Sequence, residues 1–167
     1  MTKTVKRAIT HERVKELLHY DPETGIFQWR TARPGANTES KVGTVKKGGY
    51  LLIVIDRQRI LAHRLAIFYV TGEWPENPVD HIDGNPPNNK YTNLREVPQV
   101  LNLQNMRKVR ASSKSGTMGI SWCARDQTWR ARISVNGVRK TFYNKDRAKL
   151  EQTYIEQKRK LHPGCTL

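Results

Sequence analysis

Cysteine is scarce in this sequence, and long apolar runs are missing. Its 167 residues contain two cysteines, Cys123 and Cys165, far apart and outside any Cys-x-x-Cys pair. This spacing excludes a four-cysteine zinc site and disfavours a disulfide framework, so a bound metal ion would need oxygen or nitrogen ligands. No run of 18 apolar residues occurs, and residues 1–10 lack the apolar core of a signal peptide. We therefore expect no membrane segment and a cytoplasmic location.

Acidic side chains are also few, because 15 Asp/Glu face 30 Lys/Arg and the net charge is +15. Such an imbalance predicts attraction to a polyanion, most often nucleic acid. Residues 1–75 carry +6 (13 basic, 7 acidic) and residues 107–167 carry +11 (15 basic, 4 acidic), whereas residues 76–106 carry −2 (2 basic, 4 acidic). Carboxylates between two cationic segments suit a site that binds a divalent cation and a phosphate together.

The residue pattern in the first half of the chain predicts two short helices and a hairpin. Residues 10–21, "THERVKELLHYD", have the apolar spacing of an amphipathic helix with Thr10 as its N-cap. Residues 48–62 alternate β-branched and polar side chains around the turn at Asp56, which predicts a β-hairpin. Residues 63–72 end in a glycine and predict a buried helix.

Residues 78–106 predict strand, loop, strand and helix in about thirty residues. The strands are expected at 78–82 and 92–97, separated by the turn-forming "DGNPP", and Pro98 suits the first turn of a helix that runs to about residue 107. Residues 107–117 are basic and rich in serine, so we interpret them as a linker.

An Asp-His pair and six asparagines concentrate in residues 79–105. The imidazole of His81 titrates near neutral pH and can take a proton from water, while Asp80 and an asparagine oxygen suit a hard ion such as Mg²⁺. Successive side chains on a strand point to opposite faces, so Asp80 and His81 can share one site only at a strand end or a twist. Asn102 lies about one turn into the expected helix and can face the strands.

The segment "VDHIDGNPPNNKYTNLREVPQVLNLQN" resembles the ββα-metal motif of HNH endonucleases, in the His-Asn-Asn variant of phage and group I intron homing enzymes. The preceding "LLHYDPETGIFQW" and "AHRLAIFYVTGEWP" resemble the same proteins. The resemblance implies that His81 is the general base and that Asp80 and Asn102 are metal ligands. Asn93 would orient the histidine or brace the loop. Asparagine as the third signature residue favours Mg²⁺ or Mn²⁺ over zinc.

The C-terminal segment "GTMGISWCARDQTWRARISVNGVRKTFYNKDRAKLEQTY" resembles the AP2 DNA-binding domain, three antiparallel strands packed on one helix. The Asn-Gly pair before Val138 is a strong hairpin signal. If Ile120 and Ala131 face the helix, alternation places arginines on the opposite face, where they can read a DNA groove. The candidate DNA contacts are Arg125, Arg130, Arg132, Arg139 and Lys140, with Arg64 in the first half. We interpret Trp122 and Trp129 as core residues rather than base-stacking ones, and His63 as structural.

The expected fold class is α+β: a ββα-metal nuclease core with N-terminal hairpin and helix elements, and a small three-stranded sheet with a helix. The expected domains are 1–106 (HNH nuclease, core 78–106), the linker 107–117 and 118–167 (AP2-like). The resemblance implies a metal-dependent DNA endonuclease that leaves 5′-phosphate and 3′-hydroxyl ends on double-stranded DNA in a phage-infected host cytoplasm. The alternatives are a non-catalytic DNA-binding regulator and an RNA-binding accessory protein. Target sequence, nicking versus double-strand cleavage, and oligomeric state, including a monomer, stay open.

Overall fold

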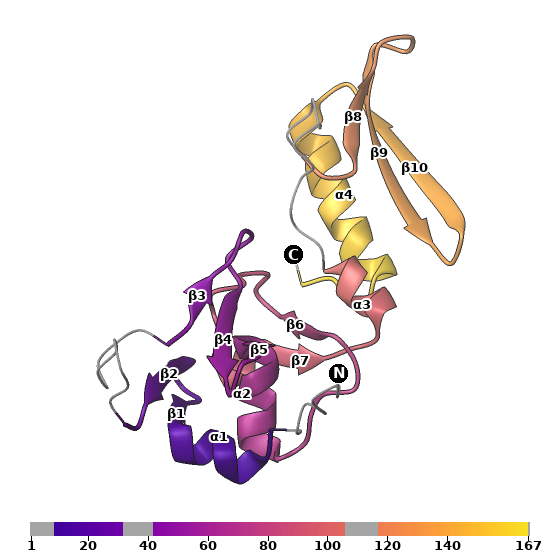
Figure 1. Cartoon of the computed structure of the whole chain (residues 1–167). Helices are drawn as coiled ribbons and strands as arrows, with labels where there is room; N and C mark the ends of the chain where they lie inside the picture. Colours follow the sequence, from indigo (N-terminus) through magenta and orange to yellow (C-terminus); the bar gives the residue numbers. More distant parts are fainter. Residues whose placement is uncertain (1–8, 32–41, 106–116, 167) are drawn as a thin grey trace, which may run out of the picture. The chain divides into compact units, whose positions relative to one another are not determined.

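A computed structural model describes residues 9–31, 42–105 and 117–166 (Figure 1). The chain divides into two compact units, Met1–Val97 and Pro98–Leu167, and each is described separately. Both combine small antiparallel sheets with helices, which confirms the expected α+β class. None of the helices in the described residues has the length and apolar character needed to span a lipid bilayer. The expected linker, 107–117, lies almost wholly outside the described residues, so the domain limits drawn from the sequence stay a prediction.

The first unit begins with α1 (His11–Leu17), capped by the Thr10 hydroxyl, which accepts a hydrogen bond from the Arg13 amide at 3.2 Å. The helix is shorter than expected, because residues 18–21 form β1 (Leu18–Asp21) and pair with β2 (Ile26–Trp29). Leu18 and Tyr20 alternate inward on this strand and are buried. Burial of alternate side chains against the sheet therefore prevails over the helical spacing of the sequence.

The expected hairpin is present as β4 (Leu51–Ile55) and β5 (Gln58–Leu61), with β3 (Thr44–Val45) added at its edge. Its two-residue turn places Asp56 and Arg57 at φ 46° and 65°, as a type I′ turn requires. The helix α2 (Ala62–Thr71) follows directly and ends at Gly72 in the left-handed conformation. Both predictions are confirmed.

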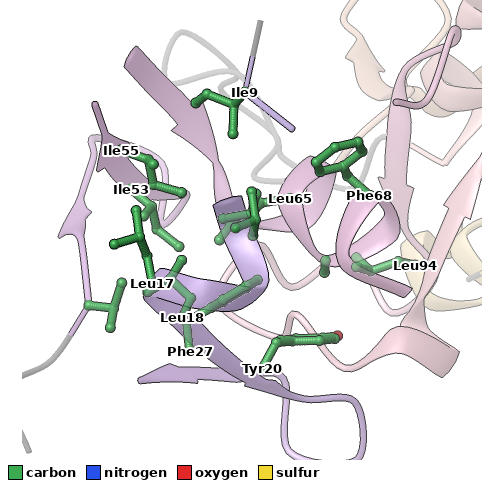
Figure 2. Close-up of a cluster of buried hydrophobic side chains, with 14 of the residues drawn as sticks. Ile9, Leu17, Leu18, Tyr20, Phe27, Ile53, Ile55, Leu65, Phe68 and Leu94 are labelled. Carbon is green, nitrogen blue, oxygen red and sulfur yellow. The ribbon is translucent and has the colours of Figure 1, made fainter. Parts of the chain in front are cut away.

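One apolar core joins these elements (Figure 2). Leu18, Ile53 and Leu65 are fully buried in it and come from a strand, a hairpin and a helix respectively. Leu94 of β7 (Leu94–Glu96) joins the same core, and β7 pairs with β6 (Val79–His81) after the short 3-10 helix η1 (Tyr91–Asn93). The core therefore fixes the short ladder that carries Asp80 and His81.

The second unit starts with α3 (Gln99–Gln104), which follows Pro98 as expected. Three strands, β8 (Ile120–Cys123), β9 (Thr128–Val135) and β10 (Val138–Asn144), form a sheet in the order β10-β9-β8. The helix α4 (Arg147–Leu161), capped by Asp146, packs on this sheet around a core of Ile120, Ala131, Ile133, Leu150 and Tyr154. The α3 helix contacts the chain after α4, because the Gly164 amide donates to Gln104 Oε1 at 2.9 Å.

Gly25, in the turn between β1 and β2, gives a test of how this hairpin supports the loop before β7. It has φ +74°, and a Cβ built on it would lie 2.4 Å from backbone atoms of Asn89 and Lys90. Gly72 has a similar φ of +80°, but its nearest neighbour would be an ordinary contact at 3.6 Å. We predict that Gly72→Ala lowers the free energy of unfolding by about 1–2 kcal/mol, the backbone cost alone. Gly25→Ala adds the clash and should lower it by at least about 3 kcal/mol.

Denaturant titration of both variants checks this, and equal losses would show that residues 89–90 do not pack on the turn.

Candidate functional site

The two leading site residues end a three-residue strand. All of β6 is buried, with Asp80 8% and His81 4% exposed. His81 is the last residue of β6, and its carbonyl accepts from the Gly84 amide at 2.8 Å as the chain turns away. The strand β6 therefore ends at His81. A strand end is one of the two conditions under which Asp80 and His81 can face the same site.

Asp80 is paired with a cation from the neighbouring strand. It lies opposite Arg95 in the β6–β7 ladder, and Arg95 Nε and Nη2 donate to the same carboxylate oxygen, Oδ2, at 3.1 and 2.9 Å. The side chains are only 10% and 25% exposed, so the pairing offsets the cost of burying both charges. Within the residues the structure describes, no group of three or more His, Cys, Asp or Glu side chains is arranged so that it could hold a metal ion.

His81 contacts an amide on the loop between β6 and β7. Its Nε2 lies 3.4 Å from Asn89 Oδ1, and Asn89 Nδ2 donates to the Pro87 carbonyl at 3.2 Å. Because an amide oxygen only accepts, the Nε2–H of His81 is the donor, and the lone pair of the neutral ring is on Nδ1. Burial lowers the pKa of His81, against the opposing effects of the Asn89 hydrogen bond and of Asp83 and Asp80. The imidazole is thus neutral near pH 7, as a base must be.

Asn93 braces the loop rather than the histidine. Its Nδ2 donates to Asp83 Oδ1 at 3.0 Å and to the Asn88 carbonyl at 2.8 Å, and its Oδ1 accepts from the Asp83 amide at 3.0 Å. Asp83 also accepts from the Asn85 amide and from Asn88 Nδ2. Burial would raise the pKa of Asp83, but these hydrogen bonds outweigh it and lower the pKa. Of the two roles expected for Asn93, its contacts match the second.

Asn89, whose role the sequence left open, is the amide that faces the histidine. Its carbonyl accepts from the Tyr20 hydroxyl at 2.7 Å, and the Tyr91 amide donates to the Pro22 carbonyl at 3.0 Å. The β1–β2 hairpin therefore holds Asn89 in place. Spacing along the motif could not reveal this, because Tyr20 lies 69 residues before Asn89.

Asn102 and Asn105 belong to the second unit. Asn102 lies on α3, so its pairing with Asp80 at a metal site stays a prediction. Asn105 is 3% exposed, and its Oδ1 accepts from both the amide and the hydroxyl of Thr166. These contacts tie α3 to the C-terminal residues of the same unit.

Comparisons with known proteins give the family of this segment. Residues 61–104 match the model of a family described as HNH endonuclease, a range that includes Asp80, His81, Asn93 and Asn102. Protein 3.8 of Escherichia phage T7 is 34% identical over 84 residues, which are 50% of this chain and 69% of the phage protein. The chain belongs to the HNH endonuclease family. A solved structure described as DNA binding and cleavage by the HNH homing endonuclease I-HmuI is 23% identical, with a TM-score of 0.40, over 75% of this chain and 71% of that one.

Arg64 of the HNH domain is held by backbone groups. Its Nη1 donates to the Asn77 carbonyl at 3.1 Å and its Nη2 to the Pro75 carbonyl at 2.6 Å. These bonds tie α2 to the chain that leads into β6. A phosphate contact by Arg64 stays a prediction, and it would have to share a guanidinium that already stabilises this connection.

The three strand arginines of the second unit that were candidate DNA contacts lie on one face of the sheet. Ile120 pairs with Ala131, and both are in the core under α4, as expected. Arg130, Arg132 and Arg139 lie opposite Tyr143, Thr141 and Ser134, all on the face away from α4, which we call the open face. Lys140 lies opposite the buried Ile133 and therefore belongs to the other face. Arg125 lies outside the strands, 88% exposed, in an ion pair with Asp126.

The two tryptophans differ in burial. Trp129 packs against the core, as expected, whereas Trp122 is 48% exposed and meets Trp129 edge-on at 5.2 Å between ring centroids. Trp122 lies opposite Trp129 in the ladder and so is on the α4 side of the sheet. The open face is therefore formed by arginine, tyrosine, threonine and serine side chains.

Near His81 a second buried histidine, His63, gives a pH test. Burial, then the neighbouring His81 and Arg64, lower the pKa of His63 to about 4 from an ordinary 6.5. The unfolded chain therefore takes up a proton first as the pH falls, so stability present above pH 6.5 is lost toward pH 4. From His63 alone we predict a loss of about 2–3 kcal/mol in the free energy of unfolding between pH 7.5 and 4.5.

Urea titration at both pH values measures this loss. The loss in the free energy of unfolding should be smaller by that amount in His63→Phe than in the wild type. The carboxylates and His81 are common to both proteins and cancel in the comparison. Equal losses in the two proteins would mean that His63 titrates normally in the fold.

Proposed function

We propose that this protein is a metal-dependent DNA endonuclease of the homing type. The observation that carries the proposal is the buried, neutral His81 at the end of β6, next to Asp80 and in contact with the Asn89 amide, within the HNH-matching segment. A buried imidazole beside a carboxylate has a cost in stability that a purely structural strand would avoid. The His-Asn-Asn spacing of residues 81, 93 and 102 supports the homing-type assignment.

The chemistry follows from the tautomer of His81. With Nε2–H donated to Asn89, the Nδ1 lone pair takes the proton of a water molecule that attacks the phosphorus of a phosphodiester. Cleavage of the bond to the 3′ oxygen then leaves a 5′-phosphate and a 3′-hydroxyl. Asn93 acts indirectly, because it fixes the loop that carries Asn89.

HNH nucleases generally use a divalent metal ion. We propose the Asp80 carboxylate and the Asn102 amide oxygen as its ligands, because oxygen donors suit Mg²⁺ or Mn²⁺ and such ions keep several waters. Such an ion would stabilise the charge that develops on the phosphate oxygens and the leaving oxygen. Arg95 shares the Asp80 carboxylate, so its guanidinium sets how strongly Asp80 can hold the ion.

The second unit is proposed to be an AP2-like DNA-binding domain. A three-stranded sheet on one helix, with arginines on its open face, has the shape and charge to enter a DNA groove. Residues 107–167 carry +11 of the net +15, so most of the affinity for phosphates is expected there. The Asp80–Arg95 pair favours one other candidate, a DNA-binding regulator that does not cleave.

Cleavage of supercoiled plasmid by the full chain with Mg²⁺ tests the proposal. We predict nicked or linear product whose ends are joined by DNA ligase without phosphorylation, and no product with EDTA. His81→Ala should lower the rate at least about 10²-fold, because a general base typically contributes 10²–10⁴-fold. His19→Ala, an exposed histidine on β1, is the matched control and should cleave as the wild type does.

Wild-type protein that binds the plasmid tightly but never cuts it would support the non-catalytic regulator instead. Unchanged cleavage by His81→Ala would remove His81 as the base.

Binding of a 30-base-pair duplex over a series of KCl concentrations tests the open face. We predict that the double variant Arg132→Ala/Arg139→Ala lowers the slope of log K against log salt by about 2, one phosphate contact for each arginine. Lys140→Ala, an exposed cation on the opposite face of the same sheet, should change the slope by less than about half a unit. Equal effects from the two faces would mean that the unit attracts DNA by net charge alone.

A further inference from the structure

A second buried imidazole contacts His81. The ring of His63 lies 5.1 Å from that of His81 between centroids, at an interplanar angle of 80°, and is 5% exposed. Tyr50, which precedes β4, lies 5.5 Å from His63 and 6.0 Å from His81. The three rings, of His63, His81 and Tyr50, form one cluster, which we call the aromatic cluster.

The backbone on which His63 stands is rigid. His63 is the second residue of α2, and Ala62, Leu65 and Ala66 beside it are fully buried in the core of the unit. The helix cannot shift without opening that core. Gly49, next to Tyr50, packs on the loop before Asn89, since a Cβ built on it would lie 3.2 Å from Pro87 Cδ. Both His63 and Tyr50 are therefore placed by elements other than β6.

Residue 63 presents a flat ring to His81 from a buried position. The rings of His63 and His81 meet at an interplanar angle of 80°, the edge-to-face arrangement that aromatic pairs favour. A ring that the core of the unit holds against the proposed base points to a role in orienting that base.

We propose that His63, supported by Tyr50, is a positioning residue that fixes the ring of His81. This inference rests on the proposed function of His81 as the base. The edge-to-face contact with His63 and the contact of Nε2 with the Asn89 amide together restrain the His81 ring to the orientation in which Nδ1 carries the lone pair. Because burial holds the pKa of His63 at about 4, the ring is neutral at pH 7 and adds no charge beside the base.

Two measurements on the full-length protein test the proposal. The first is plasmid cleavage, with kcat and KM determined separately. We expect His63→Ala to lower kcat about tenfold with KM within about twofold, since misplacement of a catalytic group affects the chemical step. His63→Phe keeps the edge-to-face contact and should stay within about threefold of the wild type. Phe68→Leu, a buried change on α2 at a ring that contacts His11 and Trp74, controls for lost stability.

The second measurement needs no cleavage. Long-range ¹H–¹⁵N spectra of the histidine rings should show His81 as a single Nε2–H tautomer in the wild type and in His63→Phe. In His63→Ala and Tyr50→Ala the His81 signals should broaden or show both tautomers. Tyr50 is 39% exposed, so Tyr50→Ala tests the cluster even where His63→Ala fails to fold. If the wild type cuts no DNA, the proposed function fails, while these spectra still decide whether the cluster fixes the ring.

Three results would overturn the proposal. A rise in KM at constant kcat would mean that His63 touches DNA. His63→Phe as slow as His63→Ala would mean that a ring nitrogen takes part in the chemistry. An unchanged His81 spectrum in both alanine variants, or a loss of kcat that Phe68→Leu reproduces, would reduce His63 to packing.

Discussion

The loop between β6 and β7 depends on hydrogen bonds rather than on apolar packing. Its residues are mainly Asp, Asn, Gly and Pro, and the side chains of Asp83 and Asn93 bond to each other and to the turn around Asn88. Such a network is stable only if its members are satisfied together. Its completeness is what keeps Asn89 at His81, so the asparagines of the motif serve mainly to make one loop conformation rigid.

The apolar core supplies the second half of this support. The loop has too few apolar side chains to fix its own conformation. It is held by a hydrogen bond from Tyr20 and by close packing on Gly25, both in the β1–β2 hairpin, and it also packs on Gly49 before β4. These segments are far apart in the sequence and are joined by the core around Leu18, Ile53 and Leu65. The N-terminal elements are therefore part of the site, although none of them carries the predicted base or metal ligands.

The sequence predicted what local chemistry determines. Alternation, the turn residues at Asp56 and the Asn-Gly pair, and the glycine after α2 identified the hairpins and the helix, because each fixes its own backbone. Residues 18–21 were wrongly expected to be helical, since only pairing with β2 makes them a strand. In the site, His81 and Asp80 were predicted from the sequence pattern, but the contacts of Asn89 and His63 join elements brought together by tertiary packing, which no local pattern records.

The charge of the chain sets a constraint on the site itself. A nuclease must bring a phosphodiester to a carboxylate, and two anions attract only if cations lie nearby. Arg95 neutralises Asp80 within the fold, so that the buried carboxylate is tolerated before any ion or DNA arrives. Most of the net positive charge is carried by residues 107–167, whereas the proposed base His81, which has to stay neutral to accept a proton, belongs to the acidic segment 76–106. The sequence thus keeps most of the positive charge apart from the proposed base along the chain, as a strongly basic protein with a neutral base requires.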